Sequence, residues 1–402
     1  MAGPLDGIRI LDWTIWQHGP VATAMLADMG AEVIHIEHPV TGDGARGVMS
    51  LVGVVTSSPS GRNFYFEANN RNKMSMTLDI TSQKGKEIVY KLVKKSDVFV
   101  QNMRKGTMEK QHLDYQTLKK YNPRLIYASG SGYGPRGPDS WLPSLDLSAQ
   151  ARSGLMCSIG GEGTPPLAVT TGLADQMGGI MLAYGILCAI IARERFGVGQ
   201  EVNTSHLGSM VMLQGLNVAA SLILGSGIPR LDREKPGNHL WNWYKCQDGE
   251  WICMASSFHY AWPWFLKAVG WSELENDPTI DTLEKRFRNE ELRQKLDELF
   301  ATKPRSEWLR ILREAGIICD PVNKIEDLAN DPQVLENGYI CEFDHPSFGR
   351  IKTVGIPVEL SETPGSLRTA APEFGQHTEE ILTNICELSW DDITVLKDER
   401  II

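Results

Sequence analysis

The first 130 residues alternate between short, continuously apolar stretches and longer stretches with apolar residues at helical spacing. Ile8–Trp13 and Glu32–Glu37 have the composition of buried strands, and Gly19–Gly30 between them has the spacing of a helix that ends at a glycine. A strand, a helix and a second strand within about thirty residues predict parallel pairing through a right-handed crossover.

The same alternation continues along the chain. Further strands are expected at 76–79, 97–100 and 125–129, and further helices at 82–95 and 113–121. This pattern is typical of the α/β class, and it predicts a large doubly wound (Rossmann-like) parallel-sheet domain. The first loop, Thr14–Pro20, has no G-x-G-x-x-G sequence, which disfavours an NAD or FAD enzyme.

The pattern changes near Gly225, after which Pro229, Pro236 and Gly237 interrupt it. Beyond this point a strand at 250–255 and a helix at 289–299 indicate a smaller α+β domain. We therefore expect residues 1–225 to form the N-terminal part of the large domain, 226–325 the small domain, and 326–402 a C-terminal segment that returns to the large domain.

One long apolar run, Met177–Ala192, contains three glycines and is shorter than the ~20 residues that a bilayer span needs. It is therefore predicted to be a buried helix and not a membrane span. The chain opens without an apolar stretch of signal-peptide length, so a cytoplasmic location is expected.

Composition and charge narrow the function classes. With 42% hydrophobic and 22% charged residues, the 402-residue chain resembles ordinary globular proteins. A formal net charge of −10 argues against binding to nucleic acid or to an anionic membrane surface. The seven cysteines are scattered and lack metal-ligand spacing, which predicts reduced thiols and no metal site.

The most informative segment is Thr171–Gly179, where a single carboxylate, Asp175, stands at the start of a nearly uncharged apolar helix. Asp175 could be a simple helix cap, worth ~1 kcal/mol. Alternatively, flanking glycines and the helix N-terminus leave the carboxylate approachable, so that it could attack a carbonyl carbon. The residues alone leave both interpretations open.

A set of motifs runs nearly from end to end of the chain. They are 5–12, 26–37, Asn72-Lys73 with Leu78-Asp79, 97–102, 122–134, the Asp175 segment, 197–202 and 375–378. Together they resemble the class III CoA-transferase (CaiB/BaiF) family, which includes formyl-CoA transferases. The family's architecture implies an interlocked dimer, either a homodimer or a heterodimer with a related subunit, in which the large domain binds CoA.

The resemblance implies that Asp175 is the nucleophile. Its carboxylate would attack the donor acyl-CoA to give a mixed anhydride, which the released CoA thiolate converts to an aspartyl-CoA thioester. The acceptor carboxylate would then attack this thioester, and CoA would be transferred to the acceptor acid. Coenzyme A and acyl-CoA are then substrates, and no tightly bound cofactor is expected.

The resemblance also assigns CoA contacts, at Gln17, His18, Val21, Ala22, His38, Asn72, Lys73, Asn102, Met103, Arg104 and Lys110. A chain of charge −10 must concentrate cations around the phosphates of CoA, and Arg71–Lys73 and Arg104-Lys105 do so. His38 and Pro143 replace an arginine and a lysine of formyl-CoA transferases, so the adenosine contacts are expected to differ.

Three residues are expected to support the nucleophile: Gln17, Asp146 and Gly237. Asp146 could orient Asp175, bind CoA or cap a helix. In the family a glycine-rich loop shields the intermediates, but Lys235–Trp241 contains only Gly237.

Two other functions stay open. An α-methylacyl-CoA racemase needs an acid/base pair, yet Leu145 precedes Asp146 and His259 stands where a glutamate is expected, which disfavours this reaction. A non-catalytic CoA-binding subunit would tolerate loss of Asp175. The dense aromatic residues between Trp241 and Trp264 favour a bulky or aromatic acceptor acid, of the benzylsuccinate type, with succinyl-CoA as donor.

Overall fold

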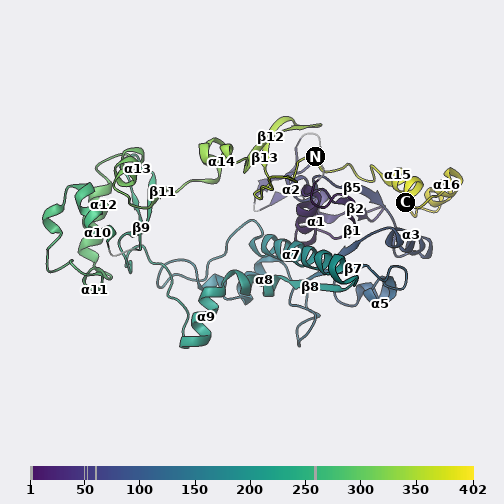
Figure 1. The fold of residues 1–402 in the computed structure, drawn as a ribbon, viewed down its shortest axis with the longest axis horizontal. Helices are drawn as coiled ribbons and strands as arrows, with labels where there is room; N and C mark the ends of the chain where they lie inside the picture. The colour runs from purple at the N-terminus through teal and green to yellow at the C-terminus, as the bar shows by residue number, and fades with distance from the viewer. Residues whose placement is uncertain (1–2, 49, 52, 59–60, 258–259) are drawn as a thin grey trace. The chain divides into compact units, whose positions relative to one another are not determined.

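The computed structural model describes residues 3–48, 50–51, 53–58, 61–257 and 260–402. The chain divides into two compact units (Figure 1). The first, here the sheet unit, comprises Met1–Met156, Ala168–Gly227 and Glu336–Ile402, and the second comprises Cys157–Leu167 and Ile228–Leu335. Relative to the expected small domain, the second unit extends further toward the C-terminus and includes the separate segment Cys157–Leu167.

A six-stranded, fully parallel sheet forms the centre of the sheet unit, in the order β5-β2-β1-β6-β7-β8. Its strands are β1 (Arg9–Trp13), β2 (Glu32–Glu37), β5 (Met74–Thr77), β6 (Val98–Gln101), β7 (Ile126–Ser131) and β8 (Glu201–Ser205). The predicted doubly wound α/β fold is confirmed. β8 was not predicted, because an edge strand of sequence Glu-Val-Asn-Thr-Ser lacks the apolar run of the others.

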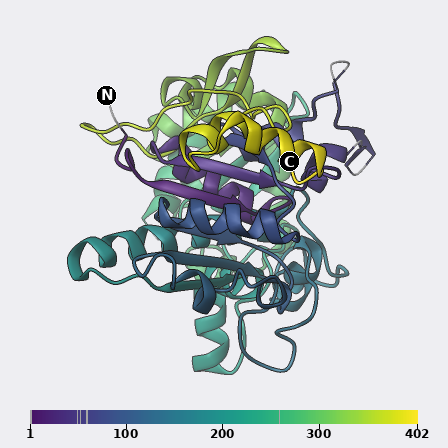
Figure 2. The same ribbon diagram turned by 90° about the vertical axis from the view of Figure 1, so that its right-hand side faces the viewer.

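Helices cover both faces of this sheet (Figure 2). Ile10 and Val98 point to the face covered by α1 (His18–Asp28) and α7 (Leu173–Phe196). Their neighbours Leu11 and Phe99 point to the other face, covered by α3 (Gln83–Lys94), α15 (Thr378–Asn384) and α16 (Trp390–Asp398). Because consecutive strand residues face opposite sides, a sheet buried on both sides needs continuously apolar strands.

The helix predicted at 113–121 is shorter in the structure, α5 (Tyr115–Leu118), and a second short helix that was not predicted, α4 (Thr107–Gln111), precedes it. His112 ends α4 with a left-handed backbone (φ 57°), and Asp114 caps α5 by accepting from the Thr117 N–H at 3.1 Å.

Helix α7 is longer than its apolar run suggested, with 24 residues, and it is only partly buried. Ile180, Tyr184 and Ile191 remain 44%, 60% and 58% exposed, which corrects the prediction of a buried helix. By length and composition α7 could cross a membrane, and the bent pair α8 (His206–Leu213) and α9 (Gly215–Leu224) could do so as a second span. This is weak support for a membrane span, because core helices of soluble proteins pass the same test and α7 packs on β7, β8 and α1.

The remaining elements of the sheet unit are short. They are β3 (Ser50–Leu51), β4 (Val54–Val55), α2 (Phe64–Asn70), α6 (Asp146–Arg152) and the antiparallel pair β12 (Ile340–His345) and β13 (Gly349–Val354).

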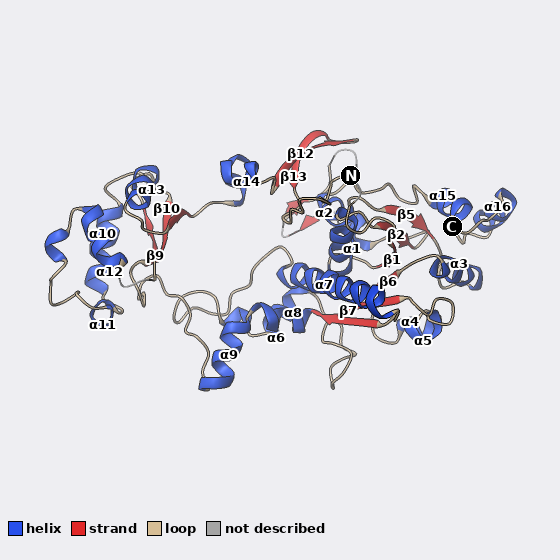
Figure 3. Ribbon diagram, viewed as in Figure 1, coloured by secondary structure: helices blue, strands red, loops and turns tan. Residues whose placement is uncertain are grey.

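The second unit is an antiparallel sheet with helices (Figure 3). The sheet has the order β11-β10-β9, from β9 (Trp241–Lys245), β10 (Trp251–Ala255) and β11 (Cys319–Pro321). Its main helices are α10 (Ala261–Val269), α11 (Leu283–Arg286), α12 (Glu290–Phe300) and α13 (Arg305–Glu314), and α14 (Pro332–Glu336) follows them. The core includes Tyr244 and Trp262, whereas Trp241 and Trp264 of the same aromatic stretch are 45% and 47% exposed.

Candidate active site

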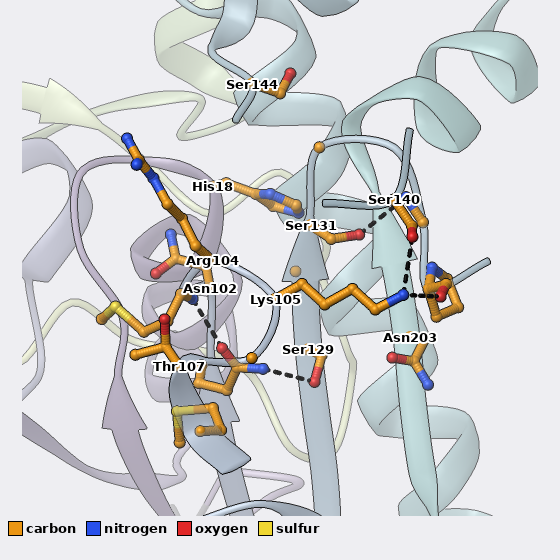
Figure 4. A pocket seen from close by; sticks show the side chains of 18 of the residues that line it. His18, Asn102, Arg104, Lys105, Thr107, Ser129, Ser131, Ser140, Ser144 and Asn203 are labelled. Carbon is orange, nitrogen blue, oxygen red and sulfur yellow. Dashed lines mark hydrogen bonds between the residues drawn. The ribbon is translucent and has the colours of Figure 1, made fainter. Parts of the chain in front are cut away.

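A cavity of about 740 Å³ lies at the carboxyl ends of the strands of the sheet unit. The segments that follow β1, β6, β7 and β8 line it, together with the first turn of α7 (Figure 4). β1 and β6 are the neighbouring strands at which the strand order reverses. In doubly wound folds, ligands bind in the crevice at this reversal point.

Asp175 borders the cavity from the first turn of α7, and its side chain is 18% exposed. Two left-handed residues, Thr171 (φ 77°) and Gly172 (φ 74°), turn the chain into the helix. The Asp175 side chain does not cap the helix: the cap position belongs to Gly172. The carboxylate is therefore left to face the cavity at the positive end of a helix dipole.

Asp146, the first residue of α6, supplies the missing cap of α7. Its Oδ1 accepts the backbone N–H of Ala174 at 2.5 Å, with the N–H of Asp175 at 3.4 Å, and its Oδ2 accepts the Gln150 amide at 2.6 Å. Among the roles predicted for Asp146, capping and orienting the Asp175 segment agree with these contacts.

One histidine contacts Asp175, and a second contacts the first. Nε2 of His206, at the start of α8, is 2.9 Å from Oδ1 of Asp175, and the His206 ring lies against the His18 ring with 4.3 Å between centroids and a tilt of 35°. Burial lowers the pKa of His18 well below its usual value, and the neighbouring His206 acts in the same direction. His206 was not predicted as a site residue, because it contacts Asp175 only through the packing of α7 against α8.

Gly178 makes room for this pair of rings. A Cβ at Gly178 would lie 2.8 Å from Nε2 of His18 and 3.2 Å from Cδ2 of His206. On the opposite side, a Cβ at Gly130 would lie 2.9 Å from Cε1 of His18. The two glycines therefore permit an approach that any side chain would prevent.

Gln17 is held close to the start of α7. Its side chain is 7% exposed, and a Cβ at Gly172 would lie 2.5 Å from its Oε1. The loop that carries it is fixed on both sides, since Asn102 exchanges two hydrogen bonds with the backbone of Ile15 and Asp43 accepts the N–H of Trp16 at 3.1 Å. The predicted supporting residue Gln17 thus lies next to the segment of Asp175.

A buried cluster of charges lies beneath that loop. Asp12 contacts Nζ of Lys73 at 2.9 Å and Nδ1 of His35 at 3.2 Å, and Nε2 of His35 is 3.6 Å from Asp43. Burial disfavours a charged His35, but the adjacent carboxylates outweigh it and raise the pKa of His35 to about 9. Because Asp12 also accepts the N–H of Thr14 at 3.1 Å, the cluster anchors the cavity loop.

The loop after β6 brings polar and basic groups to the cavity. The backbone N–H of Met103 donates to Gln101 at 2.7 Å, and Lys105 donates to the carbonyl oxygen of Pro135 at 2.9 Å. Arg104 is exposed, and its guanidinium forms no hydrogen bond or ion pair with any described residue (Figure 4). Arg104 is therefore available to an anionic ligand.

Several predicted CoA contacts do not line the cavity. Lys73 is enclosed, with Nζ bound by Asp12, Asn70 and the Pro20 carbonyl, so it has no free donor for a phosphate. The side chain of Asn72 is used fully by Asp28 and by the backbone of 366–369. The other such residues are Gln17, buried before α1, Val21 and Ala22, buried in α1, and His38 and Lys110, both exposed.

Gly237 lies exposed in the second unit, where a Cβ would first meet Phe287 at 3.6 Å. His259 lies outside the described residues. No group of three or more His, Cys, Asp or Glu side chains within the described ranges is arranged to hold a metal ion.

Comparison with known proteins gives a consistent result. The model of CoA-transferase family III matches residues 5–378. The chain is 35% identical to an acyl-CoA transferase of Fusarium pseudograminearum, over 100% of this chain and 88% of that protein. It is 31% identical to a formyl-CoA:oxalate CoA-transferase of Streptomyces avermitilis, over 100% of both chains. It is also 31% identical to an (R)-2-hydroxy-4-methylpentanoate CoA-transferase of Clostridioides difficile, over 99% of both.

Solved structures agree. A CaiB/BaiF family protein from Brucella suis superposes with a TM-score of 0.84 at 27% identity, over 96% of this chain and 100% of that one.

Proposed function

The chain belongs to CoA-transferase family III, and we propose that it transfers CoA from an acyl-CoA donor to a carboxylic acid through a covalent adduct on Asp175. The observation that carries this proposal is the placement of the Asp175 carboxylate. It borders the cavity at a helix start whose backbone N–H groups are already capped by Asp146.

The proposed reaction begins when an oxygen of Asp175 bonds to the acyl carbon of the donor. The carbon–sulfur bond breaks and its electron pair leaves on the sulfur of CoA, giving a mixed anhydride. The thiolate then attacks Cγ of Asp175, which releases the donor acid and leaves an aspartyl-CoA thioester. The acceptor carboxylate displaces the thiolate from Cγ, and the thiolate attacks the acceptor acyl carbon to form the new acyl-CoA and restore Asp175.

Each of these steps passes through an oxyanion that needs a preorganised donor. We assign Gln17 this task, because its amide lies against Gly172, three residues before Asp175. For CoA, we retain Gln17, His18, Asn102, Met103 and Arg104 from the predicted contacts. His18 is retained for its place at the cavity wall and not for direct charge pairing, since burial keeps it neutral.

For the substrates, we propose succinyl-CoA as donor and a bulky or aromatic acid as acceptor. The density of aromatic residues between Trp241 and Trp264 supports an aromatic acceptor, and these two tryptophans are 45% and 47% exposed on the second unit. The relatives named for oxalate and for (R)-2-hydroxy-4-methylpentanoate define the competing acids to be tested.

The contacts of Asp175 disfavour the racemase alternative. Racemisation needs two proton-transfer groups on opposite sides of an α-carbon. His206 touches Asp175 and so lies on the same side, and Leu145, which borders the cavity, cannot exchange a proton.

We further propose a cytoplasmic enzyme that assembles as an interlocked homodimer or with a related subunit. Large apolar side chains support assembly: Leu216, Leu222, Ile223 and Leu224 of α9 are at least 75% exposed. A stable interface would bury such a cluster.

The test of the function is mass spectrometry after incubation with acyl-CoA. The peptide containing Asp175 should gain the mass of CoA less one water, and Asp175→Asn should lose both the adduct and transfer between acids. If Asp175→Asn still transfers CoA, the proposed chemistry is wrong. If wild type exchanges an α-proton in deuterated water and transfers no CoA, the enzyme is a racemase. A wild-type protein that binds CoA but never forms the adduct would be the non-catalytic subunit.

A further inference from the structure

Three buried ring nitrogens at the wall of the cavity have no hydrogen-bond partner among the described residues. They are Nε2 of His18 and both ring nitrogens of His206. Buried polar atoms are nearly always paired, so three such nitrogens grouped beside a cavity and a carboxylate call for a functional explanation.

The His206 ring is fixed from several directions. Its side chain is 8% exposed, and it opens helix α8, whose cap Ser205 accepts the N–H of Gly208 at 3.0 Å. The ring also packs against the tilted ring of His18, with 4.3 Å between centroids. The ring edge with Nε2 is 2.9 Å from Oδ1 of Asp175, although the angle of this approach is not yet that of a hydrogen bond.

We propose that His206 is the hydrogen-bond donor to the nucleophile: its Nε2–H holds Oδ1 of Asp175, and Oδ2 is the oxygen that attacks. This inference rests on the proposed function. A carboxylate held through one oxygen presents the other in a defined direction, which reduces the entropy lost on reaching the reactive geometry.

The same donor serves the later steps. After the first attack, Oδ2 is bonded to the acyl carbon and Oδ1 is the carbonyl oxygen of the anhydride. When the CoA thiolate bonds to Cγ, the electron pair of that carbonyl moves onto Oδ1, and it returns when the bond from Cγ to Oδ2 breaks. Nε2–H of His206 is therefore placed where negative charge develops, on the atom that no substrate touches.

His18 is a positioning residue that acts through His206. The neutral His18 ring, 4.3 Å from the His206 ring and tilted by 35°, limits how that ring can turn and adds no charge beside it. Gly130 and Gly178 allow this contact, because a Cβ at either position would enter the space of the rings.

The test replaces His206 by two amide side chains whose N–H donors occupy different positions. Glutamine carries its amide nitrogen near the position of Nε2, whereas asparagine carries it near that of Nδ1. His206→Gln should keep kcat within about threefold, while His206→Asn and His206→Leu should lower kcat by roughly 10- to 100-fold, as expected for loss of a hydrogen bond to a charged group. The KM for acyl-CoA should change by less than about twofold, because the lost contact acts on the nucleophile and not on binding.

His345→Asn is the matched control, since His345 is also a buried histidine whose Nε2 contacts a carboxylate, Glu67 at 3.1 Å, and it does not line the cavity. It should lower thermal stability and leave kcat unchanged. The proposal is overturned if His206→Asn is as active as wild type, or if His206→Gln is as impaired as His206→Asn while both remain folded by circular dichroism. Should His206→Leu fail to fold, the comparison of Gln with Asn still decides. Transfer activity that survives in Asp175→Asn would overturn the proposed function itself, which is a separate result.

Discussion

Asp146 and Ala174 join two helix starts: the side chain of Asp146, the first residue of α6, accepts the backbone N–H of Ala174 in the first turn of α7 at 2.5 Å. One carboxylate therefore orders the turn that carries the proposed nucleophile, although it is 28 positions earlier in the chain.

Removing this cap should affect stability and catalysis together. We expect Asp146→Ala to lower the free energy of unfolding by about 1–2 kcal/mol, the usual value of a helix cap, and to lower kcat because the turn of Asp175 loses its anchor. Asp146→Asn, which keeps an acceptor oxygen, should recover most of both. Urea denaturation and steady-state kinetics measure the two effects, and an alanine variant with wild-type stability would contradict this role.

Gly172 should tolerate no side chain. Gly172→Ala would place a Cβ 2.5 Å from Oε1 of Gln17, at a position with φ of 74°. We expect a backbone cost of about 1–2 kcal/mol and a fall in kcat of roughly tenfold as Gln17 is displaced. Gly7→Ala is the control, because Gly7 has φ of 83° but nothing within 4 Å of its added Cβ. Equal losses of kcat in both variants would show that Gln17 is not involved.

Arg104 should contribute to CoA binding through charge. Arg104→Ala should raise the KM for acyl-CoA by roughly tenfold, leave kcat nearly unchanged, and weaken the dependence of KM on salt. Lys120→Ala serves as control, since Lys120 is exposed and does not line the cavity. A KM that responds equally to both substitutions would indicate a general charge effect.

The buried cluster around His35 should make stability depend on pH. Its pKa is raised from 6.5 to about 9, so the protonated ring stabilises the fold fully below pH 6.5, and this contribution is lost as pH rises through 9. Between pH 7 and 10 we expect wild type to lose up to about 3 kcal/mol of unfolding free energy more than His35→Asn. Denaturation curves at both pH values measure this difference, and parallel losses in the two proteins would exclude a charged His35.

The core strands of the sheet were predictable because a strand buried on both faces needs consecutive apolar residues, as Ile10-Leu11 of β1 and Val98–Val100 of β6. β8 was not, because its polar residues at the sheet edge resemble a loop. The site divides in the same way. That Asp175 stands at the start of an apolar helix could be predicted from its segment, and its proposed role came from the family resemblance. The contact with His206 could not be predicted, because it depends on how α7 packs against α8.

Lys73 shows the opposite error. Lys73, two residues after Arg71 in a chain expected to hold phosphates, was predicted to bind ligand, yet it pairs with Asp12 inside the fold. The sequence shows that Lys73 is present, but it does not show which carboxylate Lys73 contacts. That partner depends on the register of β1, β2 and β5, which brings residues far apart in the chain close together.

The absence of a side chain at position 178 also restricts how this site could change. A methyl group there would displace one imidazole, and without the imidazoles a glycine in mid-helix would leave an unfilled space. Positions 18, 178 and 206 are therefore expected to vary together among related proteins. A residue larger than glycine is expected at position 178 wherever smaller side chains replace His18 and His206.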